Sequence, residues 1–170
     1  MSTYETIQQM KKMVANLDRW LEKAVAYADT KKFDPNVLVG ARLAPDMYPL
    51  SRQVQAACDN AKFAAARLTA KEPPKHADTE TTMGELRDRC KTVLAYLDGF
   101  TGKDFEGAEQ RKVVVPYLQG KFSYGADYLC QQALPNFMFH VSMAYAILRH
   151  NGVDLGKRDY IGSIATHDLE

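Results

Sequence analysis

The chain has 170 residues, of which 46% are hydrophobic and 25% are charged. These values are those of a folded domain with enough chain to bury a core, and they exclude a disordered protein. The net charge of +1 lacks the broad positive field that nucleic-acid binding requires, so we expect no nucleic-acid partner.

The cysteines and the N-terminal residues indicate the cellular compartment of the protein. Cys58, Cys90 and Cys130 lie far apart and include no CxxC pair, which argues against a disulfide framework or a structural zinc site. The first residues are polar without a signal-peptide core, and no apolar run approaches the ~20 residues that cross a bilayer. We therefore expect a cytoplasmic protein with no membrane partner.

A first helix is predicted over residues 3–29, because apolar residues recur there at steps of three and four residues. The recurring residues are Ile7, Met10, Val14, Leu17, Leu21, Ala24 and Ala28. A long connection over residues 31–48 follows, and within it Asp34-Pro35 predicts the N-cap and first turn of a short helix through Val39.

The loop GARLAPDMYPL ends this connection and carries Arg42 and Asp46 among apolar neighbours. Two interpretations are open. The two side chains pair with each other or cap helix ends, or they belong to a functional loop of the kind that long connections often form.

The second helix is predicted to begin within residues 46–49 and to end near Ala70, before Pro73-Pro74. Its buried line consists of Leu50, Val54, Ala57, Cys58, Ala61, Ala65 and Leu68, and Gln53 and Gln55 flank this line. A third helix should start at Thr82, which forms a capping-box spacing with Glu85, and should stop at Gly99.

A two-stranded hairpin is predicted from residues 113–115 and 122–124, with a turn at Gln119-Gly120. Residues 126–134 form either a short helix or the first part of the fourth helix. That fourth helix is predicted over residues 134–152, with Pro135 in its first turn and Asn151-Gly152 at its end.

The last part of the chain either packs back across the helices or frays. We expect one domain over residues 1–162 and a mobile tail over residues 163–170. The predicted fold class is all-α: a four-helix bundle with a long connection after the first helix and a small hairpin between the third and fourth.

His140 is the main candidate for chemistry, because it lies in the apolar stripe of the fourth helix between Phe137 and Ala144. It is either a core imidazole bonded to a neighbour, or a ligand or general base in a pocket. His150, ten residues further on, is too far along the helix to share a metal with it, and is either a charge on the helix dipole or a catalyst.

Motifs that would name a reaction are absent: the sequence has no P-loop, GxGxxG, HExxH, EF-hand, GxSxG or Glu-x-x-His. Lys157, Arg158 and Asp159 follow the fourth helix, and two interpretations are open. These residues belong to a solvated tail, or the basic pair Lys157-Arg158 holds an anionic substrate.

The segments RLAPDMYPLSRQVQAACD, PPKHADTETT, LPNFMFHVSMAYAILRHNG and GKRDYIG resemble a family of bacterial proteins of unknown function. That family is placed within the DinB/YfiT-like helical-bundle superfamily, whose members include metalloenzymes. The resemblance extends to about residue 162, and it implies a bundle of four helices, a pocket at one end and often a homodimer.

The resemblance also implies a possible metal site. The superfamily binds a divalent metal through one histidine of helix two and an H-x-x-x-H pair of helix four. His140 corresponds to the first histidine of the pair, Ala144 replaces the second, and Gln53 or Gln55 falls near the helix-two ligand. Glutamine is a poor ligand for zinc or nickel, so the resemblance favours a site that holds no metal.

Three functional hypotheses follow. The first is a small polar or anionic ligand bound near His140 by a bundle that has lost the metal. The second is a metal-dependent transferase or hydrolase that uses Zn or Ni, since some superfamily members act with low-molecular-weight thiols. The third is a structural protein whose function lies in its homodimer. Whether the chain is an enzyme is left open.

Overall fold

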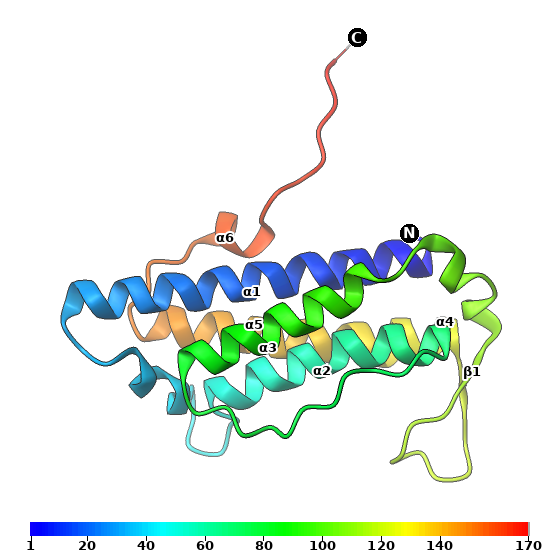
Figure 1. Ribbon diagram of the computed structural model, residues 1–170, viewed down its shortest axis with the longest axis horizontal. Coiled ribbons are helices and arrows are strands. Elements are labelled where there is room, and N and C mark those ends of the chain that lie inside the picture. The colour runs from blue at the N-terminus through cyan, green and yellow to red at the C-terminus, as the bar shows by residue number, and fades with distance from the viewer. Residues whose placement is uncertain (170) are drawn as a thin grey trace.

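The computed structural model describes residues 1–169 and is mostly helical, with one small two-stranded sheet. Its four long helices lie side by side (Figure 1), and they are α1 (Thr3–Lys31), α2 (Leu50–Thr69), α3 (Met83–Asp98) and α5 (Leu134–His150). Helix α2 packs against α3 and α5, and α1 packs against α2, α3 and α5. Their apolar faces enclose one core around Trp20 and Phe137.

Side-chain caps fix two of the helix starts that the sequence predicts. The Ser2 hydroxyl accepts from the Glu5 amide at the start of α1, and the Glu5 carboxylate accepts from the Ser2 amide in return. Thr82 and Glu85 form the same reciprocal pair at the start of α3. Each pair satisfies amide groups that have no partner within the helix.

The connection between α1 and α2 contains η1 (Pro35–Gly40), a 3₁₀ helix at the place of the predicted short helix. The Asp34 side chain accepts from the Asn36 amide and caps it. The Asn36 side chain in turn accepts from the amide of Met83, the first residue of α3. The connection is therefore anchored to the bundle and presents residues 41–49 near the start of α2.

Helix α5 begins at Leu134 with Pro135 in its first turn, as predicted, and the residues before it form the first part of the same helix, which was one of the two alternatives. Helix α4 (Gly125–Tyr128) continues through η4 (Leu129–Ala133), a π-helical turn, into α5. Proline removes one backbone donor and its ring crowds the preceding turn. The wider turn directly before Pro135 accommodates this without ending the helix.

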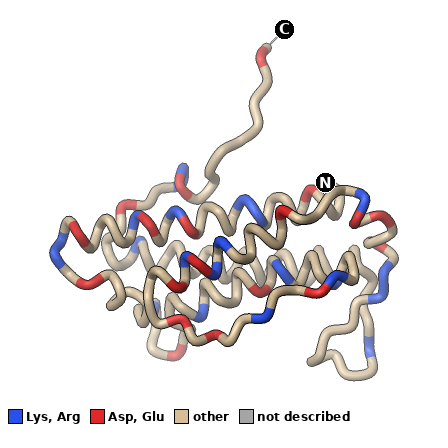
Figure 2. The backbone as a smooth tube through the Cα atoms, in the orientation of Figure 1, with Lys and Arg blue, Asp and Glu red and all other residues tan. Residues whose placement is uncertain are grey.

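The predicted hairpin is shorter than expected. Two short 3₁₀ turns, η2 (Gly102–Phe105) and η3 (Ala108–Gln110), lead from α3 to β1 (Lys112–Val113), which pairs antiparallel with β2 (Ser123–Tyr124). Val114 and Val115 leave the ladder because Pro116 follows them and cannot donate to it. Residues 114–122 form an arm that projects from the helices (Figure 1). The arm carries one charge, that of Lys121, whereas charges of both signs are spread along the long helices (Figure 2).

The segment after α5 packs back onto the bundle. Val153 and Leu155 are buried, and α6 (Lys157–Ile161) lies against α1, where the Trp20 indole donates to the Asp159 carbonyl (3.0 Å). Residues 163–169 extend away from the helices (Figure 1). The mobility of the tail stays a prediction, and its residue 170 lies outside the described residues.

Within residues 1–169, no helix combines the length and the apolar character that crossing a membrane requires.

Candidate functional site

His140 lies on the side of α5 that faces α2, and 8% of its surface is exposed. Its Nδ1 is 2.8 Å from Oε1 of Gln53, and Nε2 of Gln53 donates to the Tyr48 carbonyl at 3.2 Å. Because the amide nitrogen of Gln53 faces a carbonyl, its oxygen accepts from His140, so Nδ1 carries the proton. The neutral ring therefore leaves the lone pair on Nε2 free.

The imidazole of His140 lies beside an aromatic ring, and a cation lies over that ring. The Nε2 atom of His140 has no hydrogen-bond partner within residues 1–169, and it is not fully buried. The ring of Tyr48, which is 54% exposed, stacks on the imidazole with centroids 6.5 Å apart. The guanidinium carbon of Arg52 lies 5.7 Å from the centre of that same ring.

The surroundings of His140 favour its uncharged form. Burial lowers the pKa of His140 below its ordinary 6.5, and the positive charge of Arg52 lowers this pKa further. A neutral imidazole with a fixed tautomer accepts a proton or a hydrogen bond at Nε2.

This pKa predicts a loss of stability in mild acid. The unfolded chain binds a proton at His140 near pH 6.5 but the folded protein resists it, so the free energy of unfolding should fall as the pH drops from 7 towards 5. The slope from one histidine is at most about 1.4 kcal/mol per pH unit. Urea unfolding at several pH values measures it, and His140→Gln should flatten the slope. An unchanged slope in that variant would contradict the assignment.

The other predicted residues are placed elsewhere. Gln55 is 2% exposed and does not bond to His140; its amide donates to Glu80 (2.8 Å) and its oxygen accepts from Arg52 (2.8 Å). Arg42 and Asp46 are exposed and form no ion pair with each other, and Arg42 donates to the Met47 carbonyl. Among the predicted candidates within residues 1–169, Gln53 is the one that is hydrogen bonded to His140.

The candidates near the C-terminus lie on other surfaces. His150 is exposed in the last turn of α5. Lys157 is exposed on α6, and Asp159 on the same helix pairs with Lys23 of α1 at 2.6 Å. The ion pair with Lys23 and a hydrogen bond from the Gly156 amide hold the pKa of Asp159 below its ordinary value.

The residues around His140 do not fit the superfamily's three-histidine metal centre. Ala144 has no donor atom, and both polar atoms of the Gln53 amide are used by His140 and Tyr48. Within residues 1–169, no three His, Cys, Asp or Glu side chains are placed to share a metal ion. Metal binding by His140 stays a prediction from the resemblance.

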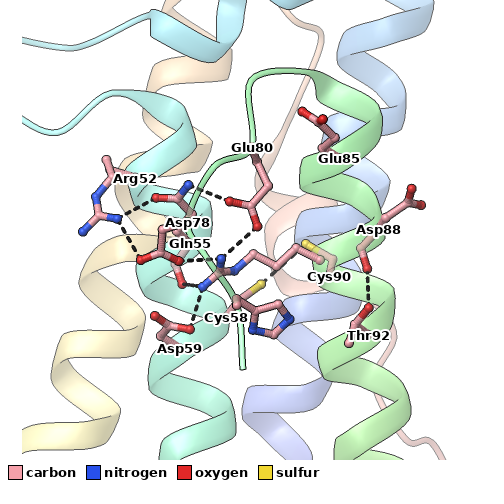
Figure 3. Close-up of polar contacts among 12 residues, drawn as sticks. Arg52, Gln55, Cys58, Asp59, Asp78, Glu80, Glu85, Asp88, Cys90 and Thr92 are labelled. Atoms are coloured by element: carbon pink, nitrogen blue, oxygen red, sulfur yellow. Dashed lines mark hydrogen bonds and ion pairs between the residues drawn. The ribbon is translucent and has the colours of Figure 1, made fainter. Parts of the chain in front are cut away.

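An ion network centred on the buried side chain of Arg89, with partly exposed carboxylates around it, was missed by the sequence analysis (Figure 3). Arg89 of α3 is 2% exposed. Its Nη1 donates to Asp78 (2.6 Å) and Glu80 (2.8 Å), and its Nη2 donates to Asp59 (2.6 Å). Burial opposes its charge, but these hydrogen bonds and carboxylates outweigh burial and raise the pKa of Arg89. The network ties the segment after α2 to helices α2 and α3.

The helical spacing of the sequence could have predicted part of this network. Arg89 falls on the buried side of α3 beside Cys90, and Lys62 falls on the buried side of α2 beside Ala61. A charged residue at a core-facing position needs a buried partner. Asp78 and Glu80, the acidic residues of the segment PPKHADTETT, were candidate partners for these buried cations.

The same two helices bring Cys58 and Cys90 together, with their sulfur atoms 3.8 Å apart. The hydrogen bond between the thiols and their complete burial raise the pKa of Cys90 well above its ordinary value. Because the thiolate is the reactive form, the raised pKa makes the buried Cys90 thiol a poor nucleophile at pH 7.

Comparison with known proteins first defines the class. A crystal structure described as a DinB family member protein from Shewanella denitrificans superposes with a TM-score of 0.92 and 43% sequence identity, over 99% of this chain and 100% of that one. The fold is therefore DinB-like. None of the curated proteins compared with the chain matches it.

The sequence itself then fixes the family. Residues 4–161 match the family described as a domain of unknown function, DUF1993. The chain belongs to this family, as the resemblance of its segments indicated.

Proposed function

We propose that this protein binds a small polar ligand at the surface formed by His140, Tyr48 and Arg52, without a metal ion. The observation that carries the proposal is the tautomer of His140, which Gln53 fixes so that Nε2 is unprotonated and not fully buried. A nitrogen held in this state accepts a hydrogen bond from an O–H or N–H group.

The neighbouring cation suggests the rest of the ligand. The Arg52 side chain is 46% exposed, and it interacts with Gln55 and Asp78 through Nη1 alone. A guanidinium has five N–H donors, so donors remain for an anionic group. The ligand class that matches both groups is a small hydroxy- or amino-carboxylate, whose O–H or N–H reaches His140 and whose carboxylate reaches Arg52.

Thermal unfolding with lactate, alanine and acetate as probes tests this function. Lactate or alanine should raise the melting temperature of the wild-type protein, and acetate, which lacks the donor group, should raise it less. His140→Gln should abolish the shift. His150→Gln on the same helix is the matched control and should keep it, because His150 is exposed at the helix end.

Native mass spectrometry of untagged protein taken directly from cells provides the second readout. We expect a co-purifying small molecule in the wild type and its loss in His140→Gln. Protein that carries no small molecule and responds to none of the probes would refute the proposal.

A homodimer is the second candidate function, and a specific observation favours it. Large apolar side chains are exposed on the arm and on α5, among them Tyr117 (68%), Val114 (66%) and Phe139 (52%). Exposed apolar surface of this kind marks interaction sites. Sedimentation at micromolar concentration tests it, and a monomer there would count against it.

The finer structural assignments are also proposals. We propose that α1, α2, α3 and α5 have the four-helix bundle layout of the DinB superfamily, which their mutual packing supports. We propose a cytoplasmic location, which the three widely spaced cysteines without a CxxC pair support.

A further inference from the structure

A second polar site lies on α2, away from the hydrogen bonds of His140, where Lys62 faces the segment after the helix. The Lys62 side chain is 3% exposed, and its ammonium nitrogen lies 2.7 Å from Oδ1 of Asp59. The same nitrogen lies 2.7 Å from Nδ1 of His76. The imidazole of His76 is therefore a base within hydrogen-bond distance of this buried ammonium group.

A cavity of about 370 Å³ opens onto this cluster. Lys62, Asp59 and His76 line it together with the apolar side chains of Phe63, Pro73 and Pro74. A volume of this size is within the range of sites for small molecules. The cavity thus combines apolar walls with the amines of Lys62 and Lys75, the carboxylates of Asp59 and Glu72, and the imidazole of His76.

The protonation state of His76 follows from its partners. A lysine ammonium only donates, so Nδ1 of His76 accepts and the proton of the neutral ring is on Nε2. Burial and the charges of Lys62 and Arg89 hold the pKa of His76 below its ordinary 6.5. The Nε2 atom is buried and has no hydrogen-bond partner within residues 1–169, which leaves a donor without an acceptor.

The charges around the cavity favour a neutral ligand. Arg52, Lys62 and Arg89 form ion pairs with Asp59, Asp78 and Glu80, so three cations balance three carboxylates. Lys75 and Glu72, which also line the cavity, add one charge of each sign and keep this balance. An anionic ligand would upset this balance at a buried site. A neutral molecule with an acceptor oxygen would not.

We propose that this cavity is a reaction site for small neutral aldehydes or ketones, in which Lys62 forms an imine. His76 Nδ1 takes one proton from the Lys62 ammonium, and the amine nitrogen forms a bond to the carbonyl carbon while the C=O π electrons move to oxygen. Protons from His76 and from the nitrogen convert this oxygen to water, which leaves. The product is a protonated imine and one water molecule, so the site keeps its positive charge for Asp59.

Reductive trapping in the wild-type protein tests the proposal without a variant. The protein is incubated with benzaldehyde and sodium cyanoborohydride, and peptide mass mapping measures the benzylation rate of each lysine. Lys62 should be modified at least about tenfold faster than Lys75, which lies exposed at the same cavity, because only Lys62 has a neighbouring base. Anionic glyoxylate should lose most of this preference.

Two variants separate chemistry from structure. His76→Gln can still accept a hydrogen bond from Lys62 but is not basic, so labelling of Lys62 should slow by about 10²-fold while circular dichroism stays unchanged. His140→Gln should leave the labelling rate at its wild-type value, so this proposal and the ligand site at His140 fail independently. Labelling of Lys62 no faster than of Lys75, or at equal rates in wild type and His76→Gln, would overturn the proposal.

Discussion

Arg89→Met is expected to lower the free energy of unfolding by about 3–5 kcal/mol, because it leaves several carboxylates clustered without their central cation. Arg89 joins Asp59, Asp78 and Glu80 through three hydrogen bonds of 2.6–2.8 Å. The whole folded state of a domain is typically stable by only about 5–15 kcal/mol, so this single change removes a large share of it. Urea unfolding followed by far-UV circular dichroism measures the loss.

Arg87→Met is the matched control on the same helix. Arg87 also forms ion pairs, with Asp18 at 2.9 Å and Glu22 at 3.0 Å, but its side chain is 24% exposed where that of Arg89 is 1% exposed. Water screens such a pair, so its loss should cost at most about 1 kcal/mol. Equal losses in the two variants would show that the Arg89 network contributes no more than a surface ion pair.

The difference between Arg89→Met and the wild type should depend on pH. Burial pushes the pKa values of Asp78 and Glu80 upward, but hydrogen bonds from Arg89 hold them below their ordinary 3.8 and 4.5. Stability from such groups is complete above the ordinary pKa and is lost as the pH falls through the lowered value. The wild type therefore loses this contribution in acid, and the difference between the two proteins should shrink as the pH falls from the ordinary pKa values through the lowered ones.

The sequence predicted the long helices well because their signals are local. The capping pairs Ser2–Glu5 and Thr82–Glu85 and the regular apolar spacing of α1 and α2 each lie within one helix. Such patterns need no knowledge of the rest of the chain. The π-helical turn before Pro135 was missed, because its formation depends on the surrounding packing that keeps the helix continuous.

The candidate sites were only partly predictable for the same reason. His140 attracted attention as a polar residue on an apolar stripe, but spacing could not choose between Gln53 and Gln55, which are adjacent to one buried line and face different partners. The Arg89 network and the Lys62–His76 pair join residues from α2, α3 and the segment between them. Contacts between residues that only the tertiary fold brings together are difficult to predict from the sequence.

Gly125→Ala should also be strongly destabilising, although alanine usually favours a helix. A Cβ atom at Gly125 would lie 1.9 Å from the Ala108 carbonyl oxygen and 2.9 Å from Cδ2 of Leu68. The first contact is with backbone, so η3 and the base of the arm would have to move away from α4. We expect a loss of about 3 kcal/mol, at the upper end of the usual cost of overpacking.

Gly84→Ala provides the control with the opposite sign. Gly84 lies in the first turn of α3, and its nearest neighbour would be the Thr82 hydroxyl at 3.9 Å, which is ordinary contact. Alanine there should raise the stability by up to about 1 kcal/mol, because it restricts the unfolded chain and favours the helix. Urea unfolding of both variants measures the two changes. The close approach of η3 to α4 sets where the arm leaves the helices. A Gly125→Ala variant as stable as the wild type would contradict this close approach.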